Sequence, residues 1–129
     1  MKNRKPMVAG NWKMNKTLGE AAELLEALKP ELMGIETVDL VVCTPYIDLP
    51  LANEILDGSN IKVGAQNLHW EASGAYTGEV SAPMLKDLCE YVIIGQDVTK
   101  TVLSRDGCVC LRELVGEVCV DVYSWIRRE

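Results

Sequence analysis

The amino-acid sequence predicts an α/β fold built on a parallel sheet, and two observations lead to this prediction. Short apolar runs at residues 6–10, 38–43 and 61–65 alternate with two segments of helical spacing, and strand–helix–strand alternation is typical of parallel βαβ units. The first run ends directly in Asn11 and Lys13, which places polar groups at the edge where parallel α/β sheets bind ligands.

The first run, residues 6–10, is short and apolar and predicts a buried strand. An amide, an indole and an ammonium follow it at Asn11, Trp12 and Lys13. By residue type alone, a lysine in this place is most often a solvated surface charge, and a lone tryptophan most often serves packing. The segment becomes a candidate site only when other parts of the chain support it.

The next element is predicted to be a helix. Thr17 followed three residues later by Glu20 forms a capping-box pattern, and the helix is expected to end at Pro30 or slightly beyond it. The charged residues off the apolar stripe are predicted to form a solvated face: Glu20, Glu23, Glu26 and Lys29. The apolar residues at helical spacing make one stripe that would pack on the sheet: Ala21, Leu24, Leu25, Leu28 and Leu32.

The middle of the chain continues the alternation of strands and helices. Residues 38–43 are nearly continuous in apolar and β-branched side chains, as strands buried on both faces are. A second helix is expected over residues 49–56, with Pro50 tolerated in its first turn. A turn over residues 57–60 then leads into the third strand at 61–65.

A long loop follows at residues 66–79 and contains the only histidine of the chain, His69. A loop of this length without secondary structure is uncommon inside a compact domain and is often a binding element. Judged by residue type and position, His69 is predicted to lie on the surface of this loop.

Composition argues against several classes of protein. A net charge of −6 over 129 residues disfavours a nonspecific nucleic-acid binder. No apolar run is long enough for a signal peptide or approaches the roughly 18 residues of a membrane helix. Five cysteines without paired spacing favour a reducing, cytoplasmic location. Cys108 and Cys110 lack metal-ligand spacing, so no metal site is expected.

Three segments, in the right order, resemble triosephosphate isomerase. AGNWKMN at residues 9–15 is similar to the opening signature of that family, and CEYVIIG at residues 89–95 is similar to its fourth strand. GAQNLHW at residues 64–70, with GAYTGEVS at residues 74–81, is similar to its third loop. The resemblance extends over about residues 4–95 without a large gap.

This resemblance implies a partial (β/α)₈ TIM barrel over residues 1–95, made of about the first four βα units with parallel strands. A complete barrel needs roughly 250 residues, about twice the 129 present. The implied activity is the interconversion of dihydroxyacetone phosphate and glyceraldehyde 3-phosphate, in glycolysis and gluconeogenesis, without a cofactor. Lys13 would be the catalytic cation that faces the substrate phosphate and the developing oxyanion. Asn11 would orient Lys13 and donate to the substrate.

The resemblance also implies a homodimer. In the family, the third loop is an arm that reaches the partner subunit beside the catalytic lysine, and its threonine supports the partner's active-site asparagine. Those two residues correspond to Thr77 and Asn11 here. The residues expected at this dimer contact are Gln66, Asn67, Tyr76, Thr77, Gly78 and Glu79.

The resemblance stops after Gly95. The family continues His-Ser-Glu-Arg-Arg, whereas this chain has Gln96 followed by Asp-Val-Thr-Lys, so glutamine replaces the family's catalytic histidine. A glutamine amide can polarise a carbonyl but cannot shuttle a proton as imidazole does. The family's catalytic glutamate, its lid loop and its later phosphate loops have no counterpart in the sequence.

Residues 96–129 are set apart as a divergent tail without a clean helical or strand period. Two explanations stay open, a genuine tail or a shifted reading frame near Gln96. Residues 99–107 can be back-translated so that a one-base shift reads Arg-Arg-Arg-Tyr-Phe-Gln-Glu-Thr, which is close to the family's continuation. We therefore expect a single-base shift in the coding DNA near this point to restore the family sequence. A gene in which no such shift does so would leave the genuine tail.

Three functions are compatible with the sequence. The first is a triosephosphate isomerase by family whose 129 residues are inactive by themselves. The second is a non-catalytic half-barrel that binds a partner, such as an intact isomerase, through the loop at residues 66–79. The third, a small α/β binding module such as a flavodoxin-like protein, is disfavoured because residues 10–13 are not glycine-rich enough to cradle a phosphate.

Half a barrel is expected to leave its first and fourth strands as open edges. The chain is therefore predicted to be marginally stable or self-associating. Residues 102–103 and 118–122 have strand-like composition and are the parts of the tail that would be suited to covering an edge.

Overall fold

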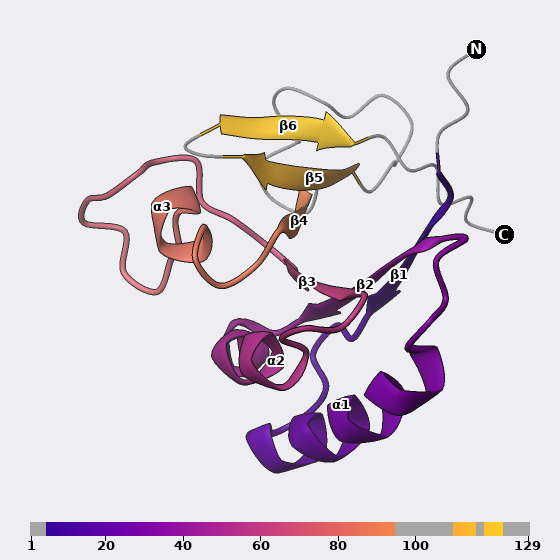
Figure 1. Cartoon of the computed structure of the whole chain (residues 1–129). Helices are drawn as coiled ribbons and strands as arrows, with labels where there is room; N and C mark the ends of the chain where they lie inside the picture. Colours follow the sequence, from indigo (N-terminus) through magenta and orange to yellow (C-terminus); the bar gives the residue numbers. More distant parts are fainter. Residues whose placement is uncertain (1–4, 95–109, 116–117, 123–129) are drawn as a thin grey trace, which may run out of the picture.

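The computed structural model describes residues 5–94, 110–115 and 118–122. These residues form a six-stranded sheet in the order β1-β2-β3-β4-β5-β6, with α1 and α2 on the same side of its first three strands (Figure 1). In the described part of the chain, no helix is long and apolar enough to cross a membrane.

The first four strands are parallel and lie side by side in sequence order. They are β1 (Met7–Asn11), β2 (Asp39–Thr44), β3 (Ile61–Ala65) and β4 (Tyr91–Ile94). Together they make the curled half-barrel that the sequence predicts (Figure 1). Because the strands run in one direction, their carboxyl ends meet at a single edge of the sheet.

Helix α1 (Leu18–Leu32) follows β1 and begins as predicted. The Thr17 backbone N–H donates to Glu20 Oε2 at 2.9 Å, and the Glu20 backbone N–H donates to Thr17 Oγ1 at 3.4 Å, so the capping box is confirmed. Ala21 and Leu25 are fully buried, which confirms the face that packs on the sheet.

The predicted solvated face is exposed at Glu20, Glu23 and Glu26, whereas Lys29 is only partly exposed. Its Nζ donates to the carbonyl of Ile55 at 2.9 Å and to that of Asp57 at 3.2 Å. These carbonyls lie at and just beyond the end of α2 (Leu49–Ile55), where a helix leaves carbonyls without intrahelical partners and favours a cation. The sequence period alone did not show that α2 ends beside this side chain.

The remaining elements connect the strands. A short 3₁₀ helix, η1 (Tyr46–Asp48), which the sequence did not predict, joins β2 to α2. Helix α2 carries Pro50 in its first turn, as predicted. Helix α3 (Ala82–Leu85) precedes β4.

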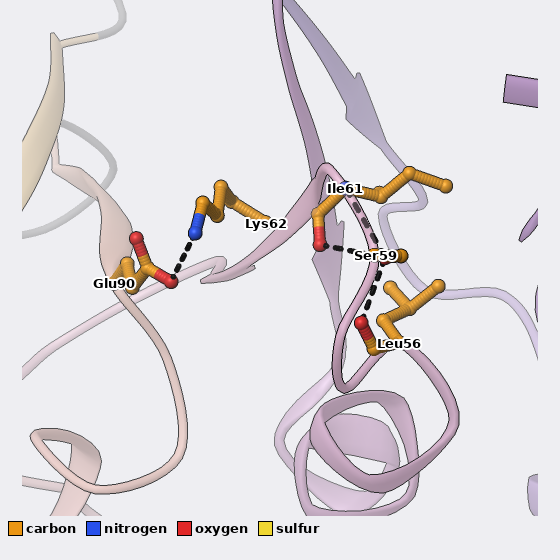
Figure 2. Close-up of polar contacts among 5 residues, drawn as sticks. All are labelled: Leu56, Ser59, Ile61, Lys62 and Glu90. Atoms are coloured by element: carbon orange, nitrogen blue, oxygen red, sulfur yellow. Dashed lines mark hydrogen bonds and ion pairs between the residues drawn. The ribbon is translucent and has the colours of Figure 1, made fainter. Parts of the chain in front are cut away.

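The turn before β3 and the start of β4 are fixed by polar contacts at the amino ends of these strands (Figure 2). Ser59 Oγ donates to the Leu56 carbonyl at 2.7 Å and accepts from the Ile61 backbone N–H at 3.2 Å. Lys62 Nζ lies 3.1 Å from Glu90 Oε1, which ties β3 to the residue before β4. This end of the sheet is opposite the edge where the candidate site is expected.

Two apolar clusters cover the two faces of the sheet. The cluster on the helix side contains Leu25, Val42, Leu49, Val63 and Val92 among others. The cluster on the inner, concave side is small and contains Val41, Cys43, Tyr91 and Ile93, with Met7 and Ala9 packed against it.

Strand β1 is not buried, contrary to the prediction. Val8 is 57% exposed, although its pairing partner Leu40 is buried. The reason is position: β1 is the end strand of the sheet, so its helix-side residue has a neighbouring strand on one side only.

The sequence predicts that the fourth strand is an open edge, and this prediction is wrong. Strand β5 (Cys110–Val115) pairs antiparallel with β4, and β6 (Val118–Val122) pairs antiparallel with β5. Residues 118–122 are therefore a strand, as their composition suggested, whereas residues 102–103 lie outside the described part. The division of the chain at residue 95 stays a prediction.

Candidate functional site

A cleft of about 850 Å³ opens at the carboxyl edge of the first three strands. Its walls come from the segment after β1, from the residues after β2 and from the first residues after β3. The residues that line it are Asn11, Lys13, Met14, Asn15, Lys16, Thr17, Glu20, Pro45, Tyr46, Ile47, Gln66 and Asn67. Asn11 and Lys13 are thus brought together at the edge that the sequence predicts.

The segment from Asn11 to Asn15 is held by local hydrogen bonds. Asn11 Oδ1 accepts from the Lys13 backbone N–H at 3.0 Å, and Asn15 Nδ2 donates to the Trp12 carbonyl at 2.8 Å. Lys13 has a φ of 55°, and Lys16 has a φ of 81°. Side chains other than glycine rarely adopt such values, and strain of this kind gathers at functional sites.

Two cations and several amides therefore face one cleft. Lys13 and Lys16 supply ammonium groups, and Asn11, Gln66 and Asn67 supply amides. Such a set can bind a phosphate or an oxyanion, because ammonium and amide N–H groups donate hydrogen bonds to anionic oxygens. It holds no group that is an obvious base for a carbon acid, apart from the exposed Glu20 of the capping box.

The other predicted contact residues lie on the loop at residues 66–79 and not in this cleft. Tyr76, Thr77, Gly78 and Glu79 are all exposed. Gly74 has a φ of 141°, and a Cβ built on it would lie 2.7 Å from the ring of Tyr76. The loop therefore needs glycine there to bring its backbone against the aromatic ring.

His69 is buried, so its predicted position on the loop surface is wrong. Only 8% of the residue is exposed, and its ring contacts those of Trp70 and Tyr76 in tilted arrangements, at centroid distances of 4.2 and 4.4 Å. Its Nδ1 lies 3.7 Å from Glu79 Oε2. The histidine thus joins two parts of the loop, a role that Trp70 beside it and Tyr76 seven residues later could have suggested.

Asp48, at the end of η1, is a buried acid that the sequence analysis missed. It is 0% exposed, and neither carboxyl oxygen has a hydrogen-bond partner. Burial, and to a smaller extent the nearby charge of Glu20, raises the pKa of the Asp48 carboxyl above its usual range.

Burial likewise raises the pKa of the Cys43 thiol to about 12, so this cysteine stays a neutral thiol in the core.

Asp48→Asn is expected to stabilise the chain near neutral pH by about 1 kcal/mol, because it removes a buried charge without a partner. The pKa of Asp48 is higher in the folded chain than in the unfolded chain. The protonated carboxyl therefore contributes its full stability at pH values below the unfolded pKa, which is about 3.9. This stability is lost as the pH rises through the folded value. Urea unfolding between pH 4 and 8 measures this, and the advantage of the variant should grow with pH. The matched control is Asp87→Asn, at an exposed site; an equal effect of both changes would contradict the prediction.

Gln96, the residue at the position of the family's catalytic histidine, lies outside the described residues. Its correspondence to that histidine and its place relative to the cleft stay predictions.

Comparisons with known proteins agree with the fold and with the segments that carry the resemblance. The family model described as triosephosphate isomerase matches residues 6–104. A triosephosphate isomerase of Dehalococcoides mccartyi is 48% identical over 111 residues, which cover 86% of this chain and 44% of that protein. One of Clostridium botulinum is 58% identical over 93 residues, which cover 71% of this chain and 37% of that protein.

A solved structure gives the same result. The crystal structure of triosephosphate isomerase from Bartonella henselae superimposes with a TM-score of 0.67 and 41% identity, covering 77% of this chain and 41% of that one. The chain thus spans less than half the length of the relatives that it matches.

Proposed function

Because the chain belongs to the triosephosphate isomerase family, we propose that Asn11 and Lys13 form the phosphate- and oxyanion-binding part of a triose phosphate isomerase site. The observation that supports this most is their common position in the cleft at the carboxyl edge of the parallel strands. Ligands bind at that edge in barrels of this class.

The proposed chemistry assigns one role to each residue. The Lys13 ammonium faces the substrate phosphate and the oxyanion that develops as dihydroxyacetone phosphate and glyceraldehyde 3-phosphate interconvert through an enediolate. A fixed charge is most effective where water is excluded. Asn11, whose Oδ1 accepts from the Lys13 backbone, keeps the lysine in place. Gln96 stands at the position of the electrophile and could polarise the carbonyl only through its amide.

The wider setting is proposed from the family. The activity belongs to glycolysis and gluconeogenesis, in the cytoplasm, and needs neither a cofactor nor a metal. The assembly is a homodimer in which the loop at residues 66–79 of one subunit reaches the other, with Thr77 beside the Asn11 of the partner copy. The exposure of Tyr76 and Thr77 in the single chain leaves them accessible for this contact.

Lys13→Ala is expected to weaken the binding of inorganic phosphate about tenfold or more, because a charge-assisted hydrogen bond to an anion is lost. Titration followed by NMR, on the signals of Asn11 and Asn15, measures the affinity. Lys62→Ala is the matched control: it removes a lysine of equal charge that pairs with Glu90 at the other end of the sheet. Equal losses in both variants would show that phosphate responds to net charge only and would refute the proposed site.

A second function, partner binding without catalysis, is favoured by the exposed aromatic residues of the loop. Trp70 is 64% exposed and Tyr76 is 45% exposed, and aromatic side chains are enriched where proteins bind one another. Mixing the chain with an intact isomerase tests this function. A heterodimer that Tyr76→Ala weakens would support it, and elution of the two proteins as separate species would refute it.

A further inference from the structure

One backbone oxygen at the carboxyl edge of the sheet joins three successive strands. The carbonyl of Cys43, in β2, accepts from the Trp12 backbone N–H at 3.0 Å and from Gln66 Nε2 at 2.9 Å. Trp12 directly follows β1, and Gln66 directly follows β3. Cys43 is fully buried, so hydrogen bonds at its backbone are stronger than they would be in bulk water.

The two donors belong to opposite walls of the cleft. On one side, Trp12 lies between Asn11 and Lys13 in the chain. On the other side, Gln66 is followed by Asn67. Asn11, Lys13, Gln66 and Asn67 all line the cleft. The common acceptor therefore links the β1 wall to the β3 wall, in addition to the backbone ladders that each strand forms with β2.

The backbone ladder joins β2 to β3 as far as the last residue of β3, and the side chain of Gln66 extends this link by one residue. The pairing of β2 with β3 ends at Thr44 and Ala65, and Gln66 is the first residue beyond the sheet. Its side-chain amide adds one bond where the backbone ladder stops. The positive φ of Lys13, 55°, is a conformation that persists only when the surrounding structure holds it.

We propose that Gln66 is a positioning residue, whose side-chain amide holds the end of β3 to the Cys43 carbonyl and so keeps the segment from Asn11 to Lys13 in place opposite Asn67. This assignment rests on the proposed function and differs from the dimer contact that the family resemblance implies for Gln66. The role requires a side chain that can donate a hydrogen bond and is as long as that of glutamine.

The first test uses the unmodified chain, labelled with ¹⁵N and ¹³C. Scalar couplings across hydrogen bonds are expected to the Cys43 carbonyl carbon from both the Trp12 backbone nitrogen and Gln66 Nε2. A coupling from Trp12 without one from Gln66 would overturn the proposal, and this measurement needs neither a ligand nor a variant.

The second test measures hydrogen exchange at the Trp12 amide. Gln66→Met keeps the size of the side chain but cannot donate, and it is expected to speed this exchange roughly three- to tenfold. The matched control is Asn67→Ala, at the neighbouring cleft position, which should leave the exchange unchanged. The amide of Val92, in the core, serves as the reference for an intact fold. Equal exchange at Trp12 in Gln66→Met and in the unmodified chain would overturn the proposal.

The third test separates positioning from packing by pH. In Gln66→Glu, the introduced carboxyl donates to the Cys43 carbonyl only when protonated. Trp12 protection is therefore expected at low pH and is lost as the pH rises through the pKa of that carboxyl, ordinarily about 4.3. A side chain that only fills space would give no such profile, so a profile identical to that of Gln66→Met would overturn the proposal.

Titration with inorganic phosphate keeps the two proposals distinguishable. If the unmodified chain does not respond at Lys13, the proposed function fails, while the couplings and exchange rates still decide the role of Gln66. If it responds equally with and without the Gln66 amide, the positioning role fails and the phosphate site stands.

Discussion

In a coupled assay, the 129-residue chain is expected to convert glyceraldehyde 3-phosphate to dihydroxyacetone phosphate no faster than buffer does. Isomerisation needs a base that takes a proton from carbon, and a positioned general base typically contributes 10²–10⁴-fold. The family is a well-known example of a glutamate base paired with a neutral histidine. The only carboxylate in the described lining of the cleft is Glu20, which is exposed and already accepts the capping-box hydrogen bond from Thr17. The family resemblance also places Gln96 where the family has its histidine.

The control for this prediction is the Lys13→Ala variant in the same assay. Background turnover from a contaminating isomerase would be equal in both proteins, because a contaminant does not carry the substitution. Activity above background that Lys13→Ala abolishes would contradict the prediction and would show that another group serves as the base. Together with the phosphate titration, the assay separates binding, which we expect the cleft to retain, from chemistry.

The elements that the sequence predicts well are those whose signals are local. The capping box at Thr17 and Glu20 needs only four consecutive residues, and both of its hydrogen bonds are formed. Strand β3 (Ile61–Ala65) has the predicted bounds because a turn precedes it and a polar loop follows it. The common edge for Asn11 and Lys13 follows from the parallel direction of the strands, which the strand–helix alternation indicates.

The residues that the sequence did not predict depend on distant parts of the chain. The partly exposed Lys29 donates to carbonyls at the end of α2, and Asp48 is buried without a hydrogen-bond partner for its carboxyl oxygens. His69 is buried by its own loop, but only after the loop folds back on it. Lysine and aspartate are residue types that are mostly exposed, and histidine is intermediate, so tertiary contacts and not residue type decide these three positions.

The acceptor at Cys43 shows the same limit for the candidate site. The sequence brings Asn11 and Lys13 to the cleft, but it gives no sign that a carbonyl in β2 receives both Trp12 and Gln66. Such a link depends on the register of three strands, and a single-residue slip would move the donors to different partners. It is visible only once the sheet is assembled.

The inner face of the sheet allows no side chain at Gly64, and Gly64→Ala is expected to destabilise the chain by about 3 kcal/mol, at the upper end of the usual cost of overpacking. A Cβ on Gly64 would lie 2.8 Å from Cys43 Sγ, 3.3 Å from a methyl of Val41 and 3.4 Å from the Cβ of Tyr91. Cys43 is fully buried, so its thiol has little room to turn away. Urea unfolding, followed by circular dichroism, measures the loss.

A double-mutant cycle identifies the cause of this loss. Cys43→Ala removes the sulfur that the new Cβ would meet, so the double variant should be more stable than the sum of the single changes predicts, by about 1 kcal/mol or more. Gly19→Ala is the matched control, because a Cβ there meets nothing within 4 Å and alanine favours the helix. Additive effects of Gly64→Ala and Cys43→Ala would mean that the sulfur is not the obstacle. The Cys43 carbonyl also accepts hydrogen bonds from Trp12 and Gln66. If the clash displaces β2, phosphate binding should therefore weaken as well. The packing of the inner face is in this way coupled to the cleft.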